Sequence, residues 1–195
     1  SMPLSAPAER TLLHLRDIEL RGYERADGLF DIEAHLTDTK DYGYANPGRG
    51  WIARAEKLHG MWVRMTIGLD MVIQSCEAVT DHSPFDICPS AAGNFARLAG
   101  IKIGPGFNRA VNERVGGVHG CTHIREVLAQ MATVAYQTLN PSRRAKATEK
   151  TQIESAKAPN GRPAIIGTCL AYAPDSPVVA MRWPHLAQKK ADAAD

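Results

Sequence analysis

Long apolar runs are missing from this 195-residue sequence, and no stretch approaches the roughly 20 apolar residues that a helix needs to cross a bilayer. The opening residues, SMPLSAPAERTL, also lack the apolar centre of a signal peptide. Neither sign of charge is in excess, since 23 lysines and arginines face 21 aspartates and glutamates, giving a net charge of +2. We therefore expect a cytoplasmic protein that binds neither membranes nor nucleic acids.

Cysteine is scarce, and no two of the four cysteines form a short-spaced pair. This spacing excludes the dense pattern of a small secreted domain held together by disulfides. The G-x-S-x-G, H-E-x-x-H and P-loop patterns are also absent. We expect reduced thiols that serve as core filler, metal ligands or nucleophiles: Cys76, Cys88, Cys121 and Cys169.

Alternating apolar and polar residues predict two β-hairpins in the first half of the chain. The first joins residues 12–24 to residues 28–38 through an Asp-Gly dipeptide, which is typical of tight hairpin turns. A polar, glycine-rich loop without a clear period follows at 39–57. The second hairpin covers residues 58–81.

Helical spacing replaces this alternation after residue 88. Short helices are expected at 88–100 and 105–117, and a long helix is expected from residue 121. The long helix has one apolar face, formed by Ile124, Val127, Leu128, Met131, Val134 and Ala135. Strands followed by helices, without βαβ alternation, indicate an α+β fold in which an antiparallel sheet of N-terminal hairpins packs against C-terminal helices.

One core domain is expected, spanning residues 11–139. Residues 1–10 are expected to be disordered or part of a tag, and residues 140–163 to form a polar linker or a surface helix. Two strand-like runs within 164–186 would complete the core, and residues 187–195 would form a tail. A homodimer is the default expectation for the oligomeric state.

Two of the cysteines stand at predicted helix starts. A thiol at a helix N-terminus faces the positive end of the helix dipole, which favours the thiolate that attacks electrophiles or binds metals. Cys121 has this position in GGVHGCTHIREV, and Cys88 has it in DICPSAAG. A small buried residue on the core face of the helix explains Cys121 equally well. Cys169 is expected in the core, and Cys76 in the core or at the surface.

Two histidines could join these cysteines. His59 begins the second hairpin, where its ring can reach the mouth of the sheet, although a surface position is the usual alternative. His123 lies two positions after Cys121, and such positions on a helix point about 200° apart. Both side chains can hold one metal only if the helix begins after Cys121, with Thr122 as its N-cap. Otherwise His123 caps the helix or packs locally.

His35 and Asp38 are candidates for a general acid or base at a strand end, with a solvent-facing position as the alternative. His14, His82, His119 and His185 have no supporting neighbours in the sequence. Four aromatic residues near His59 could line a pocket for an aromatic ligand or seal the core instead: Tyr42, Tyr44, Trp51 and Trp62.

A family resemblance rests on the segments ADGLFDIEAHLTDTK, LHGMWVRMTI, ICPSAA, IGPGF and GGVHGCTHIREVLAQMATVAYQ. From about residue 10 to the RWP at 182–184, the sequence resembles a bacterial domain-of-unknown-function family, number 2889 in its series. The GCTH segment is the most specific mark. Members of the family occur beside genes for the breakdown of aromatic acids, so the resemblance implies an aromatic acid or its thioester as the ligand.

A more distant resemblance lies in the order of elements from 59 to 139. A hairpin, a cysteine that opens a helix, a further helix and a cysteine that opens a long last helix are similar to NifU-like and SufU-like iron–sulfur cluster scaffolds. In those scaffolds three cysteines and an aspartate together hold zinc or a cluster. The resemblance implies a scaffold core of that kind.

The same resemblance implies a set of metal ligands. It places Cys88 and Cys121 at the second and third ligand cysteines, His59 at the first, and Met61 at the aspartate. Imidazole binds zinc and iron well. His123 could replace the missing carboxylate, or the fourth position could stay open, as in catalytic zinc sites.

Three functions are consistent with these residues. In the first, His59, Cys88 and Cys121, with or without His123, hold zinc or iron and activate water or polarise a carbonyl, as in a hydrolase or lyase. In the second, the same thiolates belong to a carrier or scaffold that holds a metal or an iron–sulfur cluster without catalysis. In the third, Cys121 or Cys88 is a nucleophile paired with His123 or His59 in a metal-free enzyme.

Overall fold

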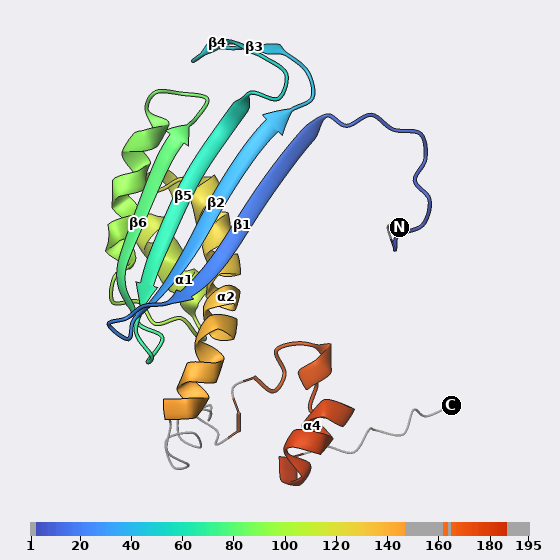
Figure 1. The fold of residues 1–195 in the computed structure, drawn as a ribbon, viewed down its shortest axis with the longest axis vertical. Helices are drawn as coiled ribbons and strands as arrows, with labels where there is room; N and C mark the ends of the chain where they lie inside the picture. Colours follow the sequence, from blue (N-terminus) through green and yellow to red (C-terminus); the bar gives the residue numbers. More distant parts are fainter. Residues whose placement is uncertain (1–2, 147–161, 164, 187–195) are drawn as a thin grey trace. The chain divides into compact units, whose positions relative to one another are not determined.

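Four long strands form one antiparallel sheet in the order β1-β2-β5-β6 (Figure 1). The computed structural model describes residues 3–146, 162–163 and 165–186. Contacts divide the chain into two units, Ser1–Ser142 and Arg143–Asp195, and the sheet belongs to the first. Its strands are β1 (His14–Glu24), β2 (Phe30–Lys40), β5 (Lys57–Ile67) and β6 (Ile73–His82).

Both predicted hairpins are present, with ends within two residues of the predicted limits. β1 pairs with β2 from His14↔Lys40 to Glu24↔Phe30. Gly28 in the turn between them has φ +82°, a left-handed conformation that glycine adopts without a steric penalty. β5 pairs with β2 on one side and with β6 on the other. The alternation in the sequence is thus an accurate guide to the sheet.

The loop predicted at 39–57 contains a second, two-stranded sheet. It is formed by β3 (Tyr44–Asn46) and β4 (Gly50–Ile52), which pair antiparallel. Each strand has only three residues, so no alternating pattern can develop and the sequence did not predict them.

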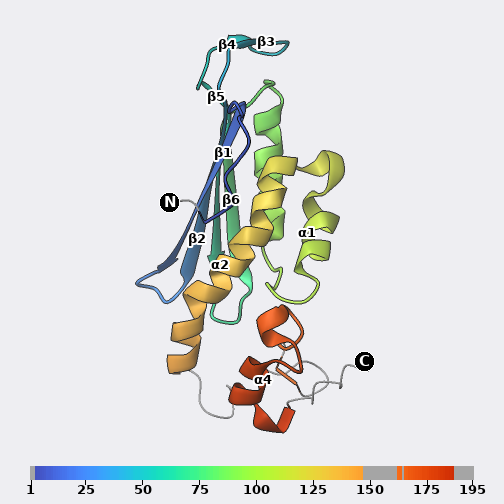
Figure 2. The same ribbon diagram turned by 90° about the vertical axis from the view of Figure 1, so that its right-hand side faces the viewer.

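Among the described residues of the first unit, helices cover one face of the four-stranded sheet and leave the other face open (Figure 2). They are the 3-10 helix η1 (Cys88–Leu98), α1 (Phe107–Val115), the short 3-10 helix η2 (Gly117–His119) and α2 (Thr122–Lys146). The predicted apolar face of α2 is buried, with Val134 partly buried at its margin. Inward-facing residues of β2 and β5, among them Phe30, Ile32 and Met65, pack against it in one hydrophobic core. The predicted α+β architecture is therefore confirmed.

The C-terminal segment forms helices, so the strands predicted within 164–186 are wrong. Its described part contains η3 (Leu170–Tyr172), α4 (Pro177–Arg182) and η4 (Pro184–Leu186). The Ser176 hydroxyl accepts a hydrogen bond from the Val179 amide and caps α4, and proline at the first helical position has no amide hydrogen that a strand could use. Cys169, expected in the core, is exposed.

Two other predicted boundaries can be compared with the structure. Among the described residues, the hydrophobic core cluster of the first unit runs from Phe30 to Leu139. α2 extends through Lys146, into the predicted linker, while residues 147–161 and 187–195 lie outside the described residues. None of the described helices is both long and apolar enough to cross a membrane.

Candidate functional site

A buried carboxylate, Asp38, lies on the inner face of the sheet near the end of β2. Its side chain is fully shielded from solvent. Arg16 on β1 donates two hydrogen bonds to it, from Nε to Oδ1 at 2.7 Å and from Nη2 to Oδ2 at 2.8 Å. His14 Nε2 lies 3.1 Å from Oδ1, and His59 Nδ1 lies 2.8 Å from Oδ2. Each carboxylate oxygen therefore has two hydrogen-bond partners.

These donors keep Asp38 ionised despite its burial. Burial alone would raise the pKa of Asp38, but the hydrogen bonds and charge of Arg16, followed by the hydrogen bond of His59, lower it to about 2. An ionised carboxylate can only accept hydrogen bonds, so Nδ1 of His59 must carry the proton.

His59 is directly opposite Asp38 in the β2–β5 register, and its ring is largely buried. Burial, followed by the charge of the neighbouring His123, lowers the pKa of His59 below its ordinary value, although the hydrogen bond to Asp38 opposes this shift. The ring is thus neutral at pH 7. With its proton on Nδ1, it presents the lone pair of Nε2 to a metal ion or a reacting group.

His123 reaches the same place from the first turn of α2. Its ring centroid lies 3.9 Å from that of His59, at an interplanar angle of 36°. Burial, followed by the charge of Arg16, lowers the pKa of His123. Potential ligand atoms of Asp38, His59 and His123 all lie within 4.8 Å of one another. This trio is defined here as the Asp38 cluster.

Cys121 adjoins the cluster through His123. Its Sγ lies 3.8 Å from Nδ1 of His123 and 3.9 Å from Sδ of Met61. The two side chains can meet because α2 begins at Thr122, so Cys121 precedes the regular helix and the 200° separation does not apply to the pair. The helix thus begins after Cys121, as a shared site requires, but Thr122 is its first helical residue and Cys121, not Thr122, has the N-cap position.

The hydrogen bonds of Asp38 determine which atoms of the cluster are available to a metal ion. A carboxylate has about four lone-pair positions, and all four are used by Arg16, His14 and His59. Asp38 therefore orients His59, as the carboxylate does in carboxylate–histidine–zinc sites. The atoms left for a metal are Nε2 of His59, a nitrogen of His123 and the sulfur of Cys121.

The spacing of Cys121 and His123 suits such an ion. With Zn–S about 2.3 Å and Zn–N about 2.0 Å, a tetrahedral site places sulfur and nitrogen about 3.5 Å apart. The 3.8 Å between Cys121 Sγ and His123 Nδ1 needs only a small adjustment.

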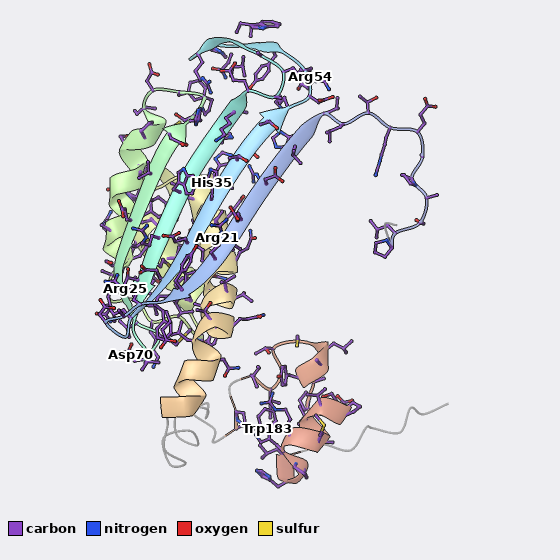
Figure 3. The ribbon with its side chains drawn as sticks, viewed as in Figure 1. Arg21, Arg25, His35, Arg54, Asp70 and Trp183 are labelled. Carbon is purple, nitrogen blue, oxygen red and sulfur yellow. The ribbon has the colours of Figure 1, made fainter. Side chains whose placement is uncertain are left out.

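Two predicted site residues lie elsewhere. Cys88 begins η1 in a half-buried position. Neither Cys88 nor Cys121 belongs to the group of potential ligands that the described residues form, but Cys121 contacts His123 of that group. His35 faces the open side of the sheet, where its ring stacks on Trp62 at 3.5 Å (Figure 3). Side chains three positions apart in a strand point to opposite faces. The predicted pairing of His35 with Asp38 at one site is therefore wrong.

The aromatic residues predicted near His59 are also divided. Trp62 lies with His35 on the open face, and Trp51 is 69% exposed on β4. Tyr42 and Tyr44 follow the end of β2, where both contact the ammonium of Lys40. No single pocket of four aromatic side chains forms.

Two residues of the site were missed by sequence reasoning, His14 and Arg16. Both share the inward face of β1 with Ile18 and Leu20, which pack against the core. A charged or polar residue at an inward position of an alternating strand is a signal for a buried partner. Arg16 also lies 3.5 Å from Glu126, one helical turn after His123, and so connects β1 with α2.

A family model described as "Protein of unknown function (DUF2889)" matches residues 14–137. The chain belongs to this family. The match confirms the family expected from the sequence, and it spans every residue of the Asp38 cluster as well as Cys121. No curated protein and no solved structure matches this DUF2889 protein.

Proposed function

We propose that this DUF2889 protein is a metal-dependent enzyme that holds zinc or iron through His59, His123 and Cys121. The observation that carries the proposal is the Asp38 cluster, whose ligand atoms lie within 4.8 Å of one another beside the Cys121 thiol. Neutral imidazoles and a thiolate are suitable ligands for either metal. Asp38 would orient His59 without binding the ion.

Three protein ligands would leave one coordination position for water or substrate. This is the pattern of catalytic zinc sites, and such a metal activates bound water for hydrolysis or polarises a carbonyl group. The family resemblance supplies the ligand class, an aromatic acid or its thioester. A thioester carbonyl would suit both types of chemistry.

A carrier or scaffold for an iron–sulfur cluster, with a NifU-like or SufU-like core, is less well supported. Iron–sulfur clusters are held mainly by cysteine thiolates, and the described site offers one, Cys121, since Cys88 lies outside it. The single thiol favours one metal ion over a cluster.

A metal-free cysteine enzyme is the second candidate, favoured by the contact of Cys121 Sγ with His123 Nδ1 at 3.8 Å. In this case His123 would accept the thiol proton and the resulting thiolate would attack the carbonyl carbon of a thioester. The substrate's own thiolate would leave and take the proton from His123, and water would then hydrolyse the acyl-enzyme. His59 would lie beside the pair, with Asp38 behind it.

Elemental analysis of protein purified without a histidine tag separates the two candidates. The metal proposal predicts about one zinc or iron ion per chain, lost in Cys121→Ser and in His123→Ala. Cys88→Ser and Cys76→Ser are matched controls that should retain the metal, because Cys88 begins η1 and Cys76 lies in the hydrophobic core, whereas Cys121 contacts His123. Equal retention by Cys121→Ser and Cys88→Ser would contradict the proposal. A metal-free wild type that hydrolyses an aryl thioester would favour the second candidate.

A further inference from the structure

We propose that Lys40, held by Tyr42 and Tyr44, is the anion-recognition point of the same site and selects a ligand with a carboxylate on an aromatic ring. The inference rests on the proposed function, because it names the residues that recognise the ligand of that site. It assigns them the role of binding and orienting the ligand and gives them no part in the chemical step.

Lys40 lies on the same face of the sheet as the Asp38 cluster. It is the last residue of β2, two positions after Asp38. The pairing with β5 is irregular between Asp38 and Thr39, but the pairing with β1 is continuous through Lys40, so the two side chains point to the same face. Directly across the ladder is His14, which itself contacts Asp38. Lys40 is therefore the next inward-facing position beyond the cluster at this end of the sheet.

The ammonium of Lys40 is held in place without being neutralised. Its Nζ lies 5.6 Å from the ring centroid of Tyr42 and 5.9 Å from that of Tyr44. Cation–π contacts of this kind attract the cation but leave its charge available. Among the described residues, no carboxylate forms an ion pair with Lys40.

The acidic residues nearest to Lys40 in the sequence are already committed to other partners. Asp38 is saturated by Arg16, His14 and His59, and Asp41 forms an ion pair with Arg54 at 2.8 Å. The ammonium of Lys40 thus carries a positive charge that no carboxylate among the described residues neutralises, and it can pair with the carboxylate of a ligand.

The two tyrosine rings supply the second part of the recognition. Their centroids lie 6.0 Å apart and their planes are tilted by 57°. Tyr42 is 43% exposed, so part of its ring surface is open to a ligand. An aromatic ring can stack on this surface while its carboxylate meets the ammonium. Because Tyr42 and Tyr44 already restrict the Lys40 side chain, ligand binding costs less side-chain entropy.

The test compares benzoate with benzamide, which share a ring but differ in charge. NMR titrations would follow binding to the wild type, Lys40→Met, Lys40→Arg and Lys102→Met. Lys102 is an exposed lysine outside this site, so its variant controls for the change in net charge. We expect the wild type to bind benzoate about tenfold more tightly than benzamide, because one hydrogen bond to a charged group contributes a difference in affinity of this size. Lys40→Met should lose the preference, whereas Lys40→Arg and Lys102→Met should keep it.

Three results would overturn the inference: equal binding of benzoate and benzamide by the wild type, an unchanged preference in Lys40→Met, or an equal loss in Lys102→Met. Circular dichroism of each variant would confirm that the sheet is intact. The titrations are made with metal-free and with zinc-loaded protein. A carboxylate preference without zinc binding would refute the proposed metal site alone, and zinc binding without the preference would refute the role of Lys40 alone.

Discussion

Asp38 and His59 are paired directly across β2 and β5, and Oδ2 of the first lies 2.8 Å from Nδ1 of the second. Because both side chains face the core, the carboxylate holds the His59 ring through its Nδ1 atom. Nε2, on the other side of the ring, points away from the carboxylate. Arg16 holds the carboxylate in turn through two hydrogen bonds. The arrangement explains why a buried charge is tolerated here.

Replacing Asp38 by Asn should weaken metal binding about 10- to 100-fold, as the loss of an orienting partner does in other metal sites. An amide keeps the shape of the carboxylate, but its NH₂ group cannot accept the hydrogen bond of His59 or Arg16. Competition with a zinc chelator measures the change. Asp41→Asn is the matched control, since Asp41 forms an ion pair with Arg54 near the surface, and this variant should bind zinc as the wild type does. Equal affinities for Asp38→Asn and the wild type would contradict the orienting role of Asp38.

Stability should fall in acid through Asp38. The pKa of Asp38 is lowered from 3.8 to about 2 in the folded state, so its stabilising effect is fully present above pH 4 and is lost as the pH falls towards 2. The shift corresponds to about 2 kcal/mol. Urea unfolding of the metal-free wild type and of Asp38→Asn should therefore show a difference in unfolding free energy that narrows by about this amount between pH 5 and pH 2. A difference that stays constant with pH would argue against an ionised Asp38.

The four thiols should differ in their reactivity towards iodoacetamide. Cys169 is exposed and should react first, whereas burial raises the pKa of Cys76 to about 12, so that this thiol should stay unmodified at pH 8. Zinc should protect Cys121 but leave the reactivity of Cys88 unchanged, because only Cys121 contacts the site. Mass spectrometry of the digested protein reads each thiol separately. Protection of Cys88 together with Cys121 would contradict the proposed ligands and support the set suggested by the sequence, which includes Cys88.

Gly22→Ala should destabilise the fold by about 1–3 kcal/mol, the usual effect of overpacking. A Cβ atom at Gly22 would lie 1.9 Å from Oγ1 and 2.9 Å from Cβ of Thr138, so a rotation of the threonine side chain cannot remove the clash. The glycine thus allows β1 to approach α2 closely. Gly93→Ala is the control, since its added Cβ would meet no atom within 4 Å. Thermal unfolding should separate the two variants, and similar melting temperatures would contradict the close contact.

The fold of the first unit was largely predictable because its strands alternate regularly and α2 has a continuous apolar face. The alternation of β2 even determines which residues meet: Asp38 points inward and His35 outward, since they are an odd number of positions apart. In the C-terminal segment, short apolar runs suggested strands, but Ser176 and the proline after it begin a helix instead. Runs this short do not distinguish a strand from a helix.

The candidate site was predictable only in part. His59, Asp38, Cys121 and His123 stand out by residue type, but their partnerships depend on which strands are neighbours. Asp38 meets His59 because β2 pairs with β5 across the segment that contains β3 and β4, a pairing that no local pattern contains. Cys88 has the same local signal as Cys121, a cysteine at a helix start, and only the placement of η1 separates the two.

The most direct test of the proposed site is X-ray diffraction at the zinc or iron absorption edge from crystals of metal-loaded protein. The metal proposal predicts one anomalous peak. It should lie about 2.0–2.3 Å from each of three atoms: Nε2 of His59, Nδ1 of His123 and Sγ of Cys121. Asp38 should keep its hydrogen bonds and make no bond to the ion. A crystal without a peak at this place, or a peak coordinated by Cys88, would contradict it.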